Sequence, residues 1–182
     1  MPKKILADLG NLSGKCVLIR VDFNVPLDDK GNITNDRRIR AALPTIRTAL
    51  DAHAAVILMS HLGRPRPGVI LTTDIYRMDK VAERLSQLLG KPVKKVDQVV
   101  GPEVTAVARA LKPGDVMLLE NLRFHPGEQK KDPELARQVA SLGDVYVNDA
   151  FGTCHREDVS MVAVPQVMKA EGKPRVVGAL VA

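Results

Sequence analysis

Short apolar runs separated by helix-like segments set the architecture that this chain can adopt. Runs such as AVILM at 55–59 and VMLL at 116–119 are apolar throughout rather than alternating, as in strands that are covered on both faces. Strands that alternate with helices predict a parallel sheet with right-handed crossovers. The five runs that we interpret as strands lie at 16–21, 55–59, 93–96, 116–119 and 145–147.

Helical periodicity fills the segments between these runs. From Asp36 to Ala52, apolar residues recur every three or four positions, and Pro44 is expected to kink this helix or to lie near its start. Start and stop signals predict further helices at 74–89, 102–111 and 133–142. The predicted fold is therefore α/β, a doubly wound, Rossmann-like three-layer domain with a parallel sheet of five or six strands.

The composition agrees with one soluble domain. A chain of 182 residues is within the usual range for one hydrophobic core, and 45% of its residues are hydrophobic. No apolar run approaches the roughly 20 residues that span a bilayer, and the N-terminus lacks the apolar stretch of a secretory signal. We expect a cytoplasmic protein with no membrane partner. Cys16 and Cys154 are too few for a disulfide or metal framework and are expected to be reduced.

The charge balance indicates an anionic partner. The formal net charge is +6, with 27 Lys and Arg against 21 Asp and Glu. Aromatic residues make up only 3% and Trp is absent, so few side chains could stack on bases, and we expect no nucleic-acid partner. Neither a GxxxxGK[ST] loop nor a GxGxxG fingerprint occurs. A small phosphorylated or carboxylated ligand is the remaining expectation.

Polar and basic residues follow the apolar runs, at the point where each run ends. Because parallel strands present their carboxyl ends to one edge, ligands bind in the crevice there. Guanidinium groups bind phosphate or carboxylate bidentately, whereas Asp22 and Asn24 would bind hydroxyls. The sequence therefore predicts an anion site at this edge. Its candidate residues are Asp22, Asn24, His61, Arg64, Arg123, His125, Asn148, Asp149, His155 and Arg156, and Arg20 and Arg38 could add two more guanidinium groups.

Each of these residues also has a structural interpretation. Charged residues favour loops in general, and any one arginine could merely pair with a nearby carboxylate such as Glu120 or Asp149. The convergence of the whole set at one edge favours the anion site. The three phenylalanines, Phe23, Phe124 and Phe151, are expected to pack beneath the loops and hold them.

The four histidines are expected to differ in role. His53 is expected on the surface at a helix end, and His125 is expected to order its loop through a hydrogen bond. His61 and His155 each lie close to an arginine in the sequence, which favours ligand binding for both. No pair of histidines has the close spacing of zinc ligands, so a zinc site is not expected.

The motifs in these loops resemble the N-terminal half of phosphoglycerate kinase, a glycolytic enzyme that moves a phosphoryl group between 1,3-bisphosphoglycerate and ADP. The resemblance covers essentially the whole chain but less than half of the enzyme that the family implies. It is carried by RVDFNVP at 20–26, ITNDRRI at 33–39, SHLGRP at 60–65, LLENLRFHPGE at 118–128 and VNDAFGTCHR at 147–156.

The resemblance implies a role for each matching residue. Asp22 and Asn24 would contact the glycerate portion of the substrate, and Arg38 would be the catalytic residue that stabilises the phosphoryl group in transfer. Arg123 and Arg156 would hold the substrate phosphate. The implied substrate-binding residues are Asp22, Phe23, Asn24, Arg38, His61, Leu62, Gly63, Arg64, Arg123 and Arg156, with Arg20 and His155 completing a basic patch.

The resemblance also implies a domain organisation. Residues 1–182 would be the N-terminal domain that binds 3-phosphoglycerate or 1,3-bisphosphoglycerate, while Mg-ADP or Mg-ATP would bind a C-terminal nucleotide domain that is expected to be absent. We expect this chain alone to be a monomer that is inactive and holds no cofactor. The closing VVGALVA is expected to lead into an interdomain helix. The alternative function is a stand-alone anion-binding or interaction module without catalysis.

Two segments depart from the family pattern. Glu157 and Asp158 follow Arg156 where the family commonly has Ala-His, which puts two carboxylates beside the predicted anion site. The stretch at 65–78 is unlike the usual short connection and is expected to alter the loop beside Arg64.

Overall fold

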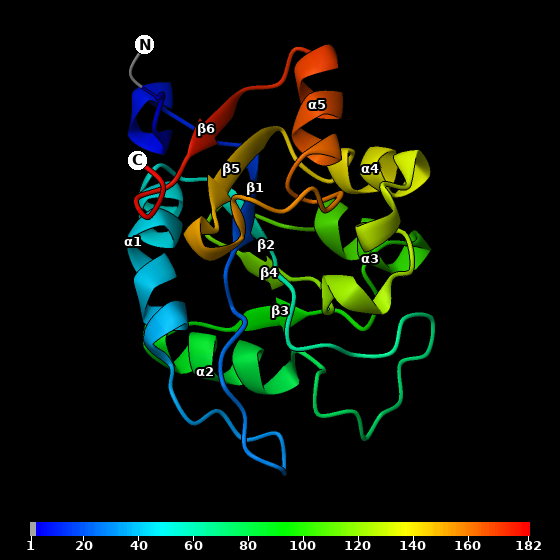
Figure 1. The fold of residues 1–182 in the computed structure, drawn as a ribbon. Coiled ribbons are helices and arrows are strands. Elements are labelled where there is room, and N and C mark those ends of the chain that lie inside the picture. The colour runs from blue at the N-terminus through cyan, green and yellow to red at the C-terminus, as the bar shows by residue number, and fades with distance from the viewer. Residues whose placement is uncertain (1–2) are drawn as a thin grey trace.

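A six-stranded sheet runs through the middle of the domain in the computed structural model, which describes residues 3–182 (Figure 1). Every pair of neighbouring strands is parallel, in the order β3-β4-β2-β1-β5-β6. The predicted α/β fold is therefore confirmed. The strands are β1 (Cys16–Val21), β2 (Ala55–Met59), β3 (Val93–Lys95), β4 (Val116–Leu118), β5 (Val145–Asp149) and β6 (Arg175–Val177).

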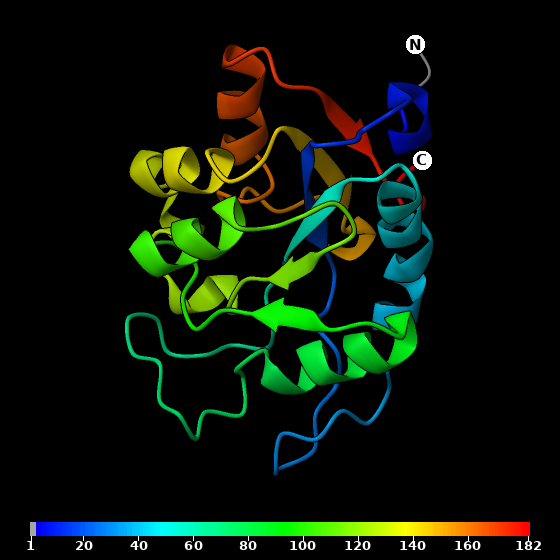
Figure 2. The same ribbon diagram turned by 180° about the vertical axis from the view of Figure 1, so that it is seen from behind.

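Helices cover both faces of this sheet, with α1 and α2 on one side and α3, α4 and α5 on the other (Figures 1 and 2). The pleat of β1 divides its side chains between two cores: Val17 and Ile19 pack with α1 and α2, whereas Leu18 packs with the opposite helices. The helices are α1 (Arg37–Asp51), α2 (Asp79–Leu89), α3 (Pro102–Arg109), α4 (Pro133–Ala140) and α5 (Ala163–Ala170). None of the helices within residues 3–182 is both long enough and apolar enough to cross a membrane.

The predicted start of the helix at 74–89 is wrong, because α2 begins only at Asp79. The Asp74 carboxylate accepts a hydrogen bond of 2.8 Å from the Tyr76 amide and closes a turn. The Met78 amide, in turn, donates to the buried Glu120 carboxylate at 2.8 Å. These two side chains hold the segment as a loop. Pro44 lies inside α1 rather than near its start.

The closing segment VVGALVA begins in a strand and continues as a turn. Val176 and Val177 belong to β6, and residues 178–181 form the turn. Two side chains anchor this turn: Thr45 accepts from the Ala179 amide and Asp149 accepts from the Leu180 amide, both at 2.9 Å. The sequence did not predict α5 or β6, both of which are short.

The register of the central strands fixes where the functional loops begin. Arg20 of β1 pairs with Met59 of β2 on one side and with Asn148 of β5 on the other. The loops that leave these three strands therefore start side by side at the carboxyl edge of the sheet. The loop after β4 joins them there, because Leu118 pairs with Leu58 of β2.

Candidate functional site

A single buried side chain, Asn121, ties together the loops that follow β2 and β4. Its Oδ1 atom accepts hydrogen bonds from the amides of Leu62 at 3.0 Å and Arg123 at 3.1 Å. Its Nδ2 atom donates to the carbonyls of Leu62 at 2.6 Å and Tyr76 at 3.0 Å. Asn121 was not among the residues predicted for the site. An amide that directly follows a buried strand was the available signal.

Gly63 occupies a position that another residue could not fill without rearrangement. Its φ of +59° lies in the left-handed region, and a Cβ atom there would come within 2.2 Å of the Tyr76 ring. Its amide donates to Asn24 Oδ1 at 2.8 Å, and its carbonyl accepts from Arg123 NH1 at 3.0 Å. Gly63 thus joins the loops after β1, β2 and β4.

Arg38 reaches from the first turn of α1 to the loop after β1. Its NH1 group donates to Asp22 Oδ1 at 3.2 Å and to the Asn24 carbonyl at 2.9 Å. The side chain is 50% exposed, and exposed ion pairs contribute little free energy. The guanidinium of Arg38 can therefore turn towards a ligand at a small cost.

Arg123 is a buried cation whose hydrogen-bonding groups are largely unused. Only 6% of the residue is exposed, yet its Nε and NH2 groups find no partner among residues 3–182. The nearby Arg156 Nε is buried and, within the same described chain, also lacks a partner. Burial and the positive charge of Arg156 both lower the pKa of Arg123. Because buried donors are costly when unpaired, this pair of guanidinium groups is suited to hold an anion.

Arg20 lies beneath the site rather than on its surface. Its Nε donates to Ser160 Oγ at 2.9 Å, its NH1 donates to the Val21 carbonyl, and its NH2 contacts His61 Nδ1 at 3.0 Å. The residue is completely buried, and this burial lowers its pKa. Arg20 therefore supports the loops from inside the domain.

His61 is held as a neutral hydrogen-bond donor. Burial, and then the charge of Arg20, lower its pKa from 6.5 to about 3. Because a guanidinium group can only donate, His61 Nδ1 must accept from Arg20, and the ring proton resides on Nε2. The neutral ring thus presents one fixed donor, although the residue as a whole is only 1% exposed.

We predict that His61 does not take up a proton between pH 8 and pH 5 in the folded protein. Its folded pKa lies below the unfolded value, so only the unfolded chain binds this proton as the pH falls through 6.5. His61 should therefore reduce the free energy of unfolding progressively between about pH 6.5 and pH 3. NMR titration of the His61 ring measures this directly, with the exposed His53 as the internal comparison. A midpoint near 6.5 for His61 would contradict the prediction.

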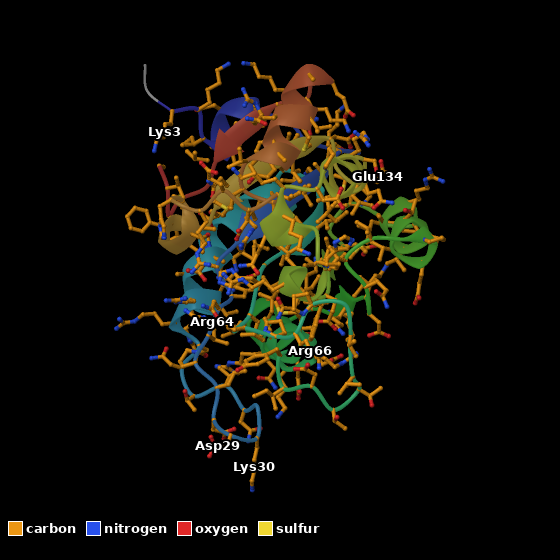
Figure 3. The ribbon with its side chains drawn as sticks, turned by 45° about the vertical axis from the view of Figure 1, so that its right-hand side comes forward. Lys3, Asp29, Lys30, Arg64, Arg66 and Glu134 are labelled. Atoms are coloured by element: carbon orange, nitrogen blue, oxygen red, sulfur yellow. The ribbon has the colours of Figure 1, made fainter. Side chains whose placement is uncertain are left out.

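The remaining predicted site residues divide into buried and exposed ones. Phe23 and Leu62 are buried, so they offer only backbone atoms to the loops. Arg64 is exposed (Figure 3). His155 is exposed as well. The seven basic residues at this edge, which we call the basic edge, are Arg20, Arg38, His61, Arg64, Arg123, His155 and Arg156.

The residues that were expected to support the loops differ in their surroundings. Phe23 and Phe124 pack beneath the loops as predicted, but Phe151 is 71% exposed, so that prediction was wrong. His125 orders its own loop, as expected, because its Nδ1 accepts from the Gly127 amide at 3.0 Å. Glu120 pairs with Lys95 instead of a basic-edge arginine.

The two carboxylates that follow Arg156 lie in different surroundings. Glu157 is exposed and forms an ion pair with the exposed Lys131. Asp158 is only 8% exposed, and no group in the described part of the chain hydrogen-bonds its Oδ2 atom. Across residues 3–182, no three His, Cys, Asp or Glu side chains are grouped so that they could hold a metal ion.

Known proteins similar to this chain share both its sequence and its fold. The family model described as phosphoglycerate kinase matches residues 6–182. The phosphoglycerate kinase of Moorella thermoacetica is 58% identical over 170 residues, which are 93% of this chain and 42% of that protein. That of Rhodopirellula baltica is 52% identical over 182 residues, which are 100% of this chain and 45% of that protein.

A solved structure gives the same result. The phosphoglycerate kinase from Coxiella burnetii superposes with a TM-score of 0.83 at 38% sequence identity, over 99% of this chain and 42% of that one. The chain therefore spans less than half the length of the relatives that it matches.

Proposed function

Because this chain belongs to the phosphoglycerate kinase family, we propose that its basic edge binds 3-phosphoglycerate and 1,3-bisphosphoglycerate. The observation that carries this proposal is the buried Arg123, whose Nε and NH2 groups have no partner within residues 3–182. These two donors form one edge of the guanidinium fork, which matches two oxygens of a phosphate group. Arg156 Nε, likewise buried and unpaired in the described chain, adds a third donor.

The other predicted residues have complementary tasks in this proposal. Asp22 and Asn24 lie in the loop after β1, where they can bind the hydroxyl group of the glycerate portion. Gly63 keeps the loop after β2 close to both Asn24 and Arg123. His61 offers a neutral donor whose orientation Arg20 fixes. The site is thus preorganised, which lowers the entropy that binding costs.

In the complete enzyme, we propose that the bound substrate exchanges a phosphoryl group with ADP. The transferred group spreads negative charge over its oxygens, so catalysis depends on positioning and on preorganised cations. Arg38 is the candidate for this task, because its half-exposed guanidinium is held, among the described residues, by Asp22 and Asn24 alone. The magnesium-bound nucleotide would be the second substrate, bound by the part of the enzyme outside this chain. By itself, this chain is not expected to transfer phosphoryl groups, since transfer requires both substrates within about 3 to 3.5 Å.

A second candidate is an anion-binding module that has no part in phosphoryl transfer. Asp158 favours it, because a buried carboxylate beside Arg123 opposes the binding of a highly charged substrate. The two candidates differ in their response to ligands. A substrate-binding domain should prefer 3-phosphoglycerate over inorganic phosphate, whereas a general anion module should bind both alike.

Replacement of Arg123 by alanine should weaken the binding of 3-phosphoglycerate by about 10- to 150-fold. This corresponds to about 1.5 to 3 kcal/mol for a charge-assisted hydrogen bond. Isothermal titration calorimetry with 3-phosphoglycerate, ADP and a short oligonucleotide measures the effect and the selectivity. Of these three ligands, the unmodified chain should bind only 3-phosphoglycerate, and its affinity should fall as the salt concentration rises.

Arg66→Ala is the matched control for this measurement. It removes the same charge from an exposed position on the neighbouring loop (Figure 3). Its affinity for 3-phosphoglycerate should stay within about twofold of the unmodified chain, as is usual for exposed charges. If the chain gives no heat at millimolar 3-phosphoglycerate, or if both variants bind as well as the unmodified chain, the proposed site is wrong.

A further inference from the structure

Asp158 is a buried carboxylate among the arginines of the basic edge. It follows Arg156 by two residues and precedes Ser160 by two, and Ser160 accepts the hydrogen bond from Arg20 Nε. The backbone on its C-terminal side is fixed, since the amides of Val159 and Ser160 donate to Glu128 at 2.9 and 2.8 Å. The Asp158 carbonyl also accepts from the amide of Met161 at 3.0 Å. The carboxylate is therefore held in place by its loop.

The carboxylate of Asp158 acts on the guanidinium of Arg123 although no hydrogen bond joins Asp158 Oδ2 to Arg123 within residues 3–182. Within the described residues, Asp158 Oδ2 has no hydrogen-bond partner, and neither do Arg123 Nε and NH2. The negative charge of Asp158 nevertheless raises the pKa of Arg123, against the effects of burial and of Arg156. Opposite charges thus share a buried region, but Asp158 Oδ2 and the Nε and NH2 groups of Arg123 remain without a hydrogen bond within residues 3–182.

We propose that Asp158 is an internal counter-ion of the basic edge, which lowers the affinity for phosphorylated ligands and lowers it more for ligands of higher charge. This inference rests on the proposed function and adds a determinant of its selectivity. A carboxylate in a partly buried site repels an incoming anion through a medium of low effective dielectric constant. Each further negative charge on the ligand adds to that repulsion.

The same carboxylate stabilises the protein before a ligand binds. Arg20, Arg123 and Arg156 are crowded at this edge, and each lowers the pKa of at least one neighbouring basic group. Among the carboxylates, Glu128 raises the pKa of Arg20 most. Asp158 raises the pKa of both Arg20 and Arg123. Removal of the Asp158 charge should therefore strengthen ligand binding while it reduces the stability of the ligand-free chain.

The neighbouring Glu157 provides a matched control. It is also a carboxylate and is adjacent in sequence, but it is exposed and paired with Lys131. Asp158→Asn and Glu157→Gln each remove one negative charge with little change in shape. Only the first should change the affinity of the basic edge.

The test is calorimetric titration of the unmodified chain and the two variants with 3-phosphoglycerate and with glycerol 3-phosphate, which lacks the carboxylate charge. Asp158→Asn should bind 3-phosphoglycerate about tenfold more tightly and glycerol 3-phosphate about threefold more tightly, as expected for one charge at short range in a site of intermediate dielectric constant. Glu157→Gln should stay within about twofold for both ligands. Thermal unfolding without ligand should show a lower melting temperature for Asp158→Asn than for Glu157→Gln.

The outcomes separate this inference from the function on which it rests. If the unmodified chain binds 3-phosphoglycerate and Asp158→Asn binds it equally or more weakly, the counter-ion role is wrong and the binding site stands. An equal increase in affinity for both ligands would also refute the counter-ion role, because the effect of Asp158 would then not depend on the charge of the ligand. If no variant binds either ligand, the proposed function fails and the inference fails with it. Asp158→Ser takes the place of Asp158→Asn if the latter does not fold.

Discussion

Replacement of Arg38 by alanine should lower the turnover of a full-length enzyme that contains this chain by about a thousandfold, the range seen when an arginine is removed from a phosphoryl-transfer site. The affinity for 3-phosphoglycerate should change far less, by about fivefold or less, because an exposed charge contributes little to ground-state binding. In the structure, Arg38 is half exposed and is held by the Asp22 carboxylate and the Asn24 carbonyl. A cation that meets charge only in the transition state affects the rate rather than the binding of the substrate.

Steady-state kinetics at saturating nucleotide separate these two effects. Arg37→Ala is the matched control, since Arg37 is the exposed neighbour of Arg38 in the first turn of α1. That variant should keep both kcat and KM close to their original values. If Arg38→Ala keeps near-normal turnover and loses only affinity, Arg38 belongs with the ordinary binding residues.

Replacement of Arg20 by methionine should destabilise the isolated chain by about 3 to 5 kcal/mol, as expected when one partner of a buried charge network is removed. Arg20 is completely buried and bonds Ser160, the Val21 carbonyl and His61. Its charge also offsets the effect of burial on the buried Glu128, whose pKa is raised. Methionine fills similar space but leaves that carboxylate and the Ser160 hydroxyl without their cation.

Urea unfolding followed by circular dichroism measures the change. Arg47→Met is the control, because Arg47 is exposed and donates only to the Leu88 carbonyl among the hydrogen bonds of residues 3–182. It should alter the free energy of unfolding by less than about 1 kcal/mol. A loss below about 1 kcal/mol for Arg20→Met would show that the buried network does not depend on Arg20.

The sheet could be predicted from the sequence because its strands are short and buried on both faces. An apolar run such as AVILM leaves few other interpretations, and β2 has the predicted bounds of 55–59. The parallel order then predicts that the residues after β1, β2, β4 and β5 meet at one edge, and they do. By contrast, α5 and β6 span only eight and three residues, and α5 contains Pro165, so their local signals were weak.

The burial and the hydrogen-bond partners of each arginine could not be predicted from the sequence. Arg20 and Arg123 both lie near strand ends. The donor groups of Arg20 form hydrogen bonds with other protein groups, whereas two donor groups of Arg123 have no partner within the described chain. Glu157 and Asp158 are adjacent carboxylates, but one is exposed and the other is buried. Such differences depend on tertiary packing, for which neighbouring positions in the sequence give no signal. The same is true of Asn121, whose four hydrogen bonds join segments far apart in the chain.

A crystal structure of this chain with bound 3-phosphoglycerate is the most direct test of the basic edge as the substrate site. We predict that the phosphate lies within hydrogen-bond distance of Arg123 Nε and NH2, the two donors that have no partner in residues 3–182. Arg156 Nε should contact the same phosphate, and the glycerate end should point towards Asp22 and Asn24. A ligand bound on another face, or one at this edge that leaves both donors of Arg123 unpaired, would contradict the proposed function.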